Sequence, residues 1–262
     1  MTVQNRTVLI TGGARGLGRE MALALADAGA RVCITGRRDS TALRDTATQL
    51  GAHGHSLIAD VSDPEQAQQS VEDAAQAIGP IDVLINNAGV GMRLISETFN
   101  TESTKFWQAD PDAWQQIVQT NVNGPFLMTR AVVPGMIARG FGKIINISTS
   151  DQTMVRRGYA PYGPSKAFLE AASRIWAQDL AGTGVDVNVL LPGGAADTDL
   201  LPPSADKKGA DGNLLSPDIM RAPIVWLASD ASNGHTGERY IARLWDDPDA
   251  ARDPGTAKPK IM

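Results

Sequence analysis

Residues 7–39 read TVLITGGARGLGREMALALADAGARVCITGRRD and contain the features that decide the fold. An apolar run, TVLIT, precedes a cluster of glycines, and a second apolar run, RVCIT, comes near the end of the stretch. Between the two runs Leu17, Met21 and Leu25 recur at the spacing of one helical face, and Gly29 favours the end of that helix. The order strand, helix, strand predicts one βαβ unit.

Further short apolar runs continue this alternation along the chain. They are apolar on both faces, as strands covered by helices on both sides must be. The pattern therefore predicts an α/β protein with a single-domain Rossmann fold, in which a doubly wound parallel sheet is flanked by helices. The runs are HSLIA (55–59), IDVLIN (81–86), KIINIS (143–148) and VDVNVLL (185–191).

The chain length and the two long polar stretches set the expected domain organisation. The 262 residues, of which 42% are hydrophobic, suit one α/β domain, which we place at residues 1–245. The stretches 90–110 and 193–215 are long for connecting loops, so we expect them to border the substrate. Residues 246–262 have the composition of a flexible C-terminal tail.

Composition excludes several classes of partner. A net charge of −5 argues against nucleic acid, and no segment reaches the ~18 apolar residues that span a membrane. The single cysteine, Cys33, lies in an apolar run and is interpreted as a core residue. His53 and His55 have no further ligand cluster near them, so we predict no metal site. We expect a soluble, cytoplasmic protein.

The glycine cluster TGGARGLG (11–18) lies between the first strand and its helix. Gly12, Gly16 and Gly18 allow a tight turn and a close approach of the backbone to a pyrophosphate at the helix N-terminus. A glycine cluster alone also fits a plain turn. The strand before it and the helix after it favour a dinucleotide site.

The residues after the second strand indicate which dinucleotide is bound. An acidic residue about 20 positions beyond the glycines takes the ribose 2′-hydroxyl of NAD, but Gly36 stands there and Arg37 and Arg38 follow. Guanidinium groups suit a 2′-phosphate, and Arg15 in the glycine loop is a further candidate. We therefore predict NADP(H) in preference to NAD(H), with Asp39 as the one signal against it.

Over residues 5–240 the chain resembles a classical short-chain dehydrogenase/reductase (SDR). The resemblance rests on several motifs in one order and at typical distances, each of which is weak alone. They are TGGARGLG (11–18), ADV (59–61), NNAG (86–89), NVNG (121–124), STS (148–150), YGPSK (162–166) and PGGAADT (192–198).

The resemblance implies further contacts with the cofactor. Thr198 is assigned to the nicotinamide carboxamide although the family spacing points to Asp197, one position earlier. Together with Arg37 and Arg38, which the rule for the 2′-phosphate gave above, the predicted cofactor-binding residues are Gly12, Ala14, Arg15, Gly16, Leu17, Gly18, Asp60, Val61, Asn87, Ala88, Gly89, Tyr162, Lys166, Pro192, Gly193 and Thr198.

Tyr162 and Lys166 are four positions apart and so share one helical face. A nearby ammonium favours ionisation of a phenol, which otherwise titrates near 10. The resemblance implies that Tyr162 exchanges a proton with the substrate oxygen and that Lys166 also holds the nicotinamide ribose. It further implies that Asn121 fixes a water on the proton path.

The hydroxyl that orients the substrate is ambiguous. The commonest family distance, counted back from Tyr162, reaches Thr149, where the family normally has serine. Threonine supplies the same donor with an added methyl group. We prefer Thr149, with Ser150 as the alternative.

The resemblance thus implies an enzyme that interconverts a carbonyl and a secondary alcohol of a small-molecule substrate, with Asn121, Thr149, Tyr162 and Lys166 as the catalytic residues. We also expect a homodimer or homotetramer. Two alternatives remain: a nucleotide-binding regulatory protein without useful catalysis, and a dehydratase or epimerase that retains its cofactor. The substrate itself is not indicated.

Overall fold

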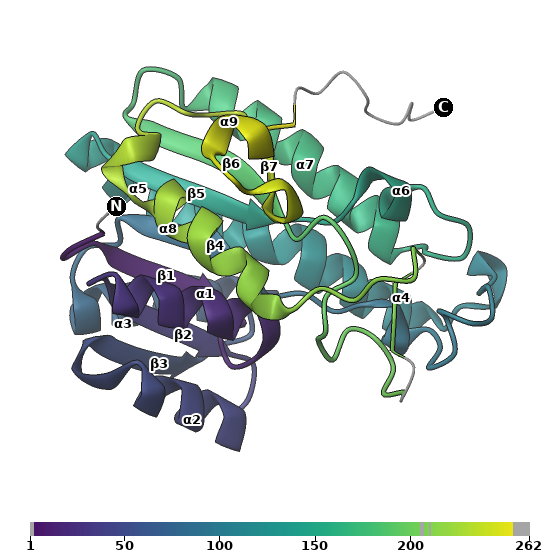
Figure 1. Ribbon diagram of the computed structural model, residues 1–262. Coiled ribbons are helices and arrows are strands. Elements are labelled where there is room, and N and C mark those ends of the chain that lie inside the picture. Colours follow the sequence, from purple (N-terminus) through teal and green to yellow (C-terminus); the bar gives the residue numbers. More distant parts are fainter. Residues whose placement is uncertain (1–2, 205–206, 210, 254–262) are drawn as a thin grey trace.

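Parallel strands form the centre of the molecule (Figure 1). The computed structural model describes residues 3–204, 207–209 and 211–253. Within them the sheet has seven strands in the order β3-β2-β1-β4-β5-β6-β7, so the chain reverses its direction of growth beside β1, as in doubly wound folds. The strands are β1 (Thr7–Thr11), β2 (Arg31–Gly36), β3 (Gly54–Ile58), β4 (Val83–Asn86), β5 (Gly142–Ile147), β6 (Val185–Leu191) and β7 (Arg239–Ile241).

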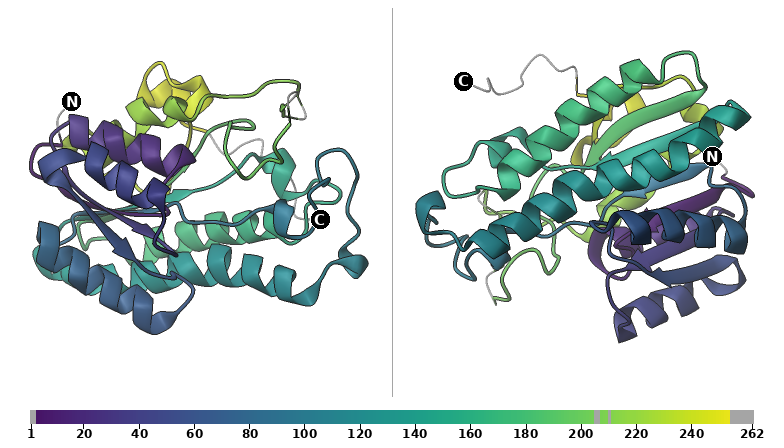
Figure 2. Two further views of the ribbon diagram at one scale, coloured as in Figure 1. Left: turned by 90° about the horizontal axis from the view of Figure 1, so that it is seen from below. Right: turned by 180° about the vertical axis from the view of Figure 1, so that it is seen from behind.

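Helices cover both faces of this sheet (Figure 2). Residues of α1, α2 and α8 belong to the core on one face, and residues of α3, α5 and α7 belong to the core on the other. The helices are α1 (Gly16–Asp27), α2 (Thr41–Gln49), α3 (Pro64–Ile78), α4 (Pro111–Val118), α5 (Gly124–Arg139), α6 (Asp151–Met154), α7 (Tyr162–Asp179), α8 (Arg221–Ala228) and α9 (Pro248–Ala251).

Successive strand residues point to opposite faces, which explains why the predicted runs are apolar throughout. Leu9 lies in register with Cys33 and Leu84, and all three pack in the core beneath α3 and α5. Their neighbours Val8 and Val32 pack in the opposite core, against α1 and α8. Cys33 is fully buried, and burial raises the pKa of its thiol to about 12, which confirms its interpretation as a core residue.

The predicted strands are confirmed. Part of the segment 246–262, which was expected to be a flexible tail, is folded. Residues 248–251 form α9, and Asp247 caps this helix by accepting a bond from the Ala250 amide. Arg252 then pairs with Tyr240 of β7 in an antiparallel bridge. The polar composition hid this helix because four residues carry too little periodicity to detect. Residues 254–262 lie outside the described residues.

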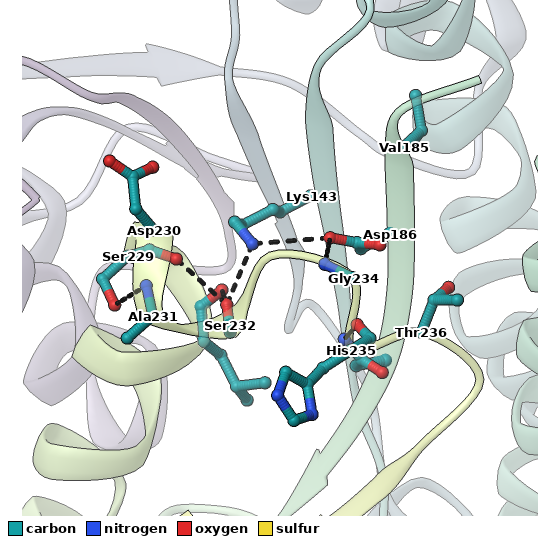
Figure 3. Close-up of polar contacts among 12 residues, drawn as sticks. Lys143, Val185, Asp186, Ser229, Asp230, Ala231, Ser232, Gly234, His235 and Thr236 are labelled. Atoms are coloured by element: carbon teal, nitrogen blue, oxygen red, sulfur yellow. Dashed lines mark hydrogen bonds and ion pairs between the residues drawn. The ribbon is translucent and has the colours of Figure 1, made fainter. Parts of the chain in front are cut away.

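A buried lysine lies at the amino end of the sheet, away from the strand ends that precede the predicted site (Figure 3). Lys143, the second residue of β5, donates to the Ser232 hydroxyl at 2.9 Å and lies 3.5 Å from Asp186. Burial holds the pKa of Lys143 below its usual value, although the Asp186 carboxylate opposes the shift. Asp186 also accepts a bond from the Gly234 amide, so each charged group keeps a partner.

Across the described residues, no helix has both the length and the apolar character needed to cross a membrane.

Candidate functional site

A cleft with a volume of about 1770 Å³ lies at the carboxyl ends of the strands. Its lining comes from the loops after β1, β2, β3, β4, β5 and β6, because the carboxyl ends of parallel strands meet at one edge of a sheet. It brings together most residues predicted from the sequence: Gly12, Ala14, Arg15, Gly16, Leu17, Gly18, Arg37, Asp60, Val61, Asn87, Ala88, Gly89, Thr149, Tyr162, Lys166, Pro192, Gly193 and Thr198.

Two predicted residues are not in the lining. Arg38, the second residue after β2, is exposed and is not among the described residues that line the cleft. Asn121 is fully buried behind the cleft wall. The assignments of Arg38 to the cofactor and of Asn121 to the reaction stay predictions, and the contacts of Asn121 are described below.

The glycine loop has no room for side chains. A Cβ on Gly18 would lie 2.3 Å from the Gly12 carbonyl oxygen and 2.4 Å from Nδ2 of Asn87. Asn87 holds the loop, since its Nδ2 donates to the carbonyls of Thr11 at 3.0 Å and Gly12 at 2.9 Å. Helix α1 begins here, and no side chain caps its N-terminus. Its first backbone amides are therefore available to bind a phosphate group at the edge of the cleft.

Two of the three arginines predicted at the phosphate end already have an acidic partner. Arg37 lies 2.8 Å from Asp60, and Arg15 lies 2.7 Å from Asp199. Burial raises the pKa of Asp60, but hydrogen bonds from Ser62 and the charge of Arg37 outweigh it and hold the pKa below its usual value. A bound 2′-phosphate would have to share these guanidinium groups with the carboxylates.

Helix α7 begins at Tyr162, and Lys166 lies one turn further on the same face. Lys166 is buried, and its Nζ donates to the carbonyl of Ile147 at 2.8 Å. Burial lowers the pKa of Lys166 to about 8, opposed by the charge of Glu170. Burial raises the pKa of Tyr162 to about 12, opposed by the side chain of Thr149. The phenol therefore carries its proton at neutral pH when the cleft holds no added positive charge.

The three hydroxyls after β5 have different surroundings. Thr149 lines the cleft and its side chain interacts with Tyr162. Ser150 shares a 2.9 Å hydrogen bond with the Thr153 hydroxyl in α6. The buried Oγ of Ser148 has no hydrogen-bond partner among the described residues. Of the two alternatives left by the sequence, Thr149 is thus the one beside Tyr162.

Asn121 joins the loop after β4 to α7. It lies in a π-helical turn (Gln119–Asn123) between α4 and α5. Its Oδ1 accepts from the Val90 amide at 2.9 Å, and its Nδ2 donates to the Val90 carbonyl at 3.0 Å and to the Ser165 hydroxyl at 3.1 Å. These bonds fix the cleft wall beside Lys166, while the expected contact with a water stays a prediction.

Residues of the two long stretches line the cleft, and their expected contact with the substrate stays a prediction. Met92 and Phe99 line it and are buried, and Phe99 packs edge-on against Tyr159 at 5.6 Å between ring centroids. Phe106 and Trp107 are largely exposed, so this part of the stretch does not wall the pocket.

Sequence reasoning missed a buried arginine at the site. Arg239 begins β7 and is only 5% exposed. It forms ion pairs with Asp151 at 2.6 Å, Glu170 at 3.0 Å and Asp253 at 2.7 Å. The sequence shows a basic residue at the start of the otherwise apolar run RYI, but its partners Asp151 and Glu170 are far from it in the chain.

Comparisons with known proteins show the family and the fold of this chain. Residues 6–209 match the profile of the family described as short chain dehydrogenase. The chain is 31% identical over 245 residues to the 3-oxoacyl-[acyl-carrier-protein] reductase FabG of Salmonella typhimurium, covering 91% of this chain and 96% of that protein.

Two solved structures are similar along nearly the whole chain. The 3-ketoacyl-(acyl-carrier-protein) reductase of Brucella melitensis, complexed with NADH, gives a TM-score of 0.81 at 29% identity and covers 91% of this chain and 96% of its own. The gluconate 5-dehydrogenase of Burkholderia cenocepacia, in complex with NADP and tartrate, gives 0.79 at 29% identity, with coverages of 92% and 94%.

Proposed function

The chain belongs to the short-chain dehydrogenase family, and from that premise we propose that it is an NADP(H)-dependent oxidoreductase that interconverts a carbonyl compound and a secondary alcohol. The observation that carries the proposal is the placement of Tyr162 and Lys166 on one helical face in a cleft that also holds the glycine loop. Similarity to two reductases acting on oxoacyl carriers supports the same reaction class.

The cleft fits a nicotinamide dinucleotide. A Cβ on Gly12 would lie 2.9 Å from the Cα of Ala88, and a Cβ on Gly18 would lie 2.3 Å from the Gly12 carbonyl oxygen, so only glycine allows this tight turn at the start of the helix, where a pyrophosphate suits the backbone. Arg37 and Asp60 suit the adenosine end, while Lys166 and Thr198 suit the nicotinamide end. When bound, the cofactor supplies the hydride in reduction and accepts it in oxidation.

The protein supplies orientation and a proton. The Thr149 hydroxyl donates to the substrate carbonyl oxygen, and Tyr162 gives its proton to that oxygen as the negative charge develops. A phenol with a pKa near 12 suits this role in reduction, because the developing oxyanion is a stronger base than the phenolate. Oxidation needs the phenolate, which Lys166 and a cationic nicotinamide ring favour.

A preference for NADP(H) rests on the residues of this chain, since the two similar structures hold NADH and NADP respectively. Gly36 stands at the position where an acidic residue would bind the 2′-hydroxyl of NAD. Arg37 lies in the cleft wall beside it. A guanidinium group attracts a 2′-phosphate and gains no comparable bond from a hydroxyl.

Exposed apolar residues support the proposal of a homodimer or homotetramer. Phe126 and Ile137 on α5 are exposed, as are Phe168 and Ile175 on α7. On each helix the two residues share one face, and both helices cover the same side of the sheet (Figure 2). Such patches are typical of interfaces between subunits. Sedimentation of a monomer at micromolar concentration would contradict this part of the proposal.

The proposed activity is tested with the purified protein, NADPH or NADH, and a panel of ketones, oxoacyl thioesters and keto sugars. We expect turnover with NADPH that is lost in Tyr162→Phe. Tryptophan fluorescence measures binding of each cofactor separately from turnover. Binding without turnover over the whole panel would favour the regulatory alternative, and absence of binding would contradict the proposed function altogether.

A further inference from the structure

Arg239 is a buried cation that joins four separate parts of the chain. Its guanidinium group contacts Asp151 at the start of α6, Glu170 in the middle of α7, and Asp253 after α9. It also donates to the main-chain carbonyl of Thr149 at 3.1 Å. A buried charge is tolerated only when it is paired and hydrogen-bonded, and here every nitrogen of the guanidinium has a partner.

Two of these contacts fix the loop that carries the proposed substrate-orienting hydroxyl. One nitrogen, Nη2, bonds both the Thr149 carbonyl and the Asp151 carboxylate, so it holds the chain on either side of Ser150. This part of the chain follows the end of β5 and has no strand neighbour to hold it. The side chain of Thr149 reaches Tyr162 only while its main chain stays in this position.

A third contact acts on α7. Both carboxylate oxygens of Glu170 lie 3.0 Å from Nε of Arg239, and Glu170 is one turn beyond Lys166 on the same helical face. The guanidinium thus keeps this carboxylate turned towards β7. Without it, the carboxylate would be free to turn towards Lys166 and compete for its ammonium group.

The fourth contact extends the arrangement to the C-terminal segment. Asp253 pairs with Nη1 of Arg239 through its side chain, and its amide donates to the Arg239 carbonyl at 2.8 Å. Arg239, Asp253, Asp151 and Thr149 all line the cleft. The segment after β7 therefore forms part of the site and is not an appendage to it.

We propose that Arg239 is a positioning residue for the reaction: it holds Thr149 and Glu170 in register with Tyr162 and Lys166, and Asp253 holds Arg239. This inference rests on the proposed function for its catalytic consequence. It also predicts a local structural consequence that is measurable without a substrate.

The test compares Arg239→Gln, Arg239→Lys and Asp253→Asn with Lys143→Met, a control that removes another buried cation at the opposite end of the sheet. We expect Arg239→Gln to lower kcat by roughly a hundredfold, as small misplacements of reacting groups do, and to change the KM for the cofactor less than threefold. Arg239→Lys should have a higher kcat than Arg239→Gln, because lysine keeps the positive charge. Asp253→Asn has a smaller effect in the same direction, and Lys143→Met leaves kcat within threefold.

Hydrogen–deuterium exchange of residues 148–155 supplies the readout that needs no turnover. We expect faster exchange there in Arg239→Gln and Asp253→Asn, and unchanged exchange in Lys143→Met. Wild-type exchange rates in Asp253→Asn, which keeps the arginine and is the milder change, would overturn the inference even if Arg239→Gln failed to fold. So would a kcat for Arg239→Gln, per folded molecule, equal to that of Lys143→Met. An inactive wild-type protein would count against the proposed function alone.

Discussion

Lys166 donates a 2.8 Å hydrogen bond to the main-chain carbonyl of Ile147, the last residue of β5. The bond anchors α7 to the end of a central strand and holds a buried ammonium group on the helix that begins at Tyr162. Burying this charge is unfavourable, which is why the pKa of Lys166 falls to about 8. A residue proposed to act in the reaction thus lowers the free energy of unfolding of the protein.

Replacing this lysine should stabilise the fold while it removes activity. Below pH 8 folded and unfolded states both hold the proton, so the folded state bears the full cost of the buried charge. A displacement from 10.5 to about 8 corresponds to about 3 kcal/mol, and the bond lost at Ile147 offsets about 1 kcal/mol. We expect Lys166→Met to raise the free energy of unfolding at pH 7 by about 2 kcal/mol, measured with urea.

The pH dependence provides the check on this explanation. Between about pH 8 and 10.5 the folded wild-type protein loses the Lys166 proton before the unfolded chain does, so its stability rises with pH relative to that of Lys166→Met. The difference between the two proteins should therefore shrink over that interval. A constant difference would show that the gain at pH 7 comes from packing and not from the charge.

Tyr162→Phe removes the proposed proton donor without changing the shape of the side chain. We expect kcat to fall by about 10²- to 10⁴-fold, the usual contribution of general acid catalysis. Binding of NADPH, followed by tryptophan fluorescence, should be almost unchanged because the ring stays in place. A variant that retains more than a tenth of kcat would show that another group delivers the proton.

Substitutions at Thr149 decide which hydroxyl orients the substrate. Thr149→Ser keeps the donor and should retain kcat/KM within about fivefold, whereas Thr149→Val has the same shape without the hydroxyl. Losing one donor to a developing oxyanion costs about 10²- to 10³-fold, so we expect that loss for the valine variant. Ser150→Ala, which breaks only the bond with Thr153, should have the smaller effect. The reverse order would move the role to Ser150.

Cofactor preference should depend on Arg37 and not on its neighbour. Arg37→Ala removes a charged contact with the 2′-phosphate, so we expect the Kd for NADPH to rise about 10- to 100-fold and the Kd for NADH to stay within threefold. Arg38→Ala is the matched control, because that side chain is exposed and outside the cleft lining. Equal effects of Arg37→Ala on both cofactors would contradict a 2′-phosphate contact.

The charges of the cleft predict a preference for acidic substrates. Arg156 and Arg157 line it and form no ion pair with an acid among the described residues. Arg156 stacks over the ring of Tyr159, with 5.0 Å from its guanidinium carbon to the ring centroid. The other arginines of the lining have acidic partners: Arg15, Arg37, Arg93, Arg239 and Arg243.

We therefore expect a keto acid to be reduced with a higher kcat/KM than its methyl ester, with acetoacetate and methyl acetoacetate as one matched pair. Arg156→Gln should reduce that ratio about tenfold, the effect of one charged hydrogen bond. Arg44→Gln, which breaks the ion pair with Asp39 outside the cleft, is the control. A ratio that does not change in Arg156→Gln would show that the guanidinium remains solvated.

The parts of the site that sequence alone predicted depend on local geometry. Strand, glycine loop and helix follow one another in the chain, so the place of Gly12, Gly16 and Gly18 between them could be predicted, although the residues packed against them are distant in the chain. The shared face of Tyr162 and Lys166 follows from helical periodicity. Arg239 was missed for the opposite reason: its partners Asp151 and Glu170 lie far from it in the chain and meet it only in the folded protein.

The sequence by itself determined the α/β architecture and the order of the predicted strands, because both follow from the spacing of apolar residues along the chain. It also determined the residues of the glycine loop, because that turn needs the backbone freedom of glycine. Only the tertiary structure decided that Thr149 and not Ser150 lies beside Tyr162, that Asn121 bonds to Val90 behind the cleft, and that Arg239 meets three acids and the Thr149 carbonyl. These contacts join residues up to about a hundred positions apart, and their geometry exists only once the strands have paired and brought their carboxyl ends to one edge.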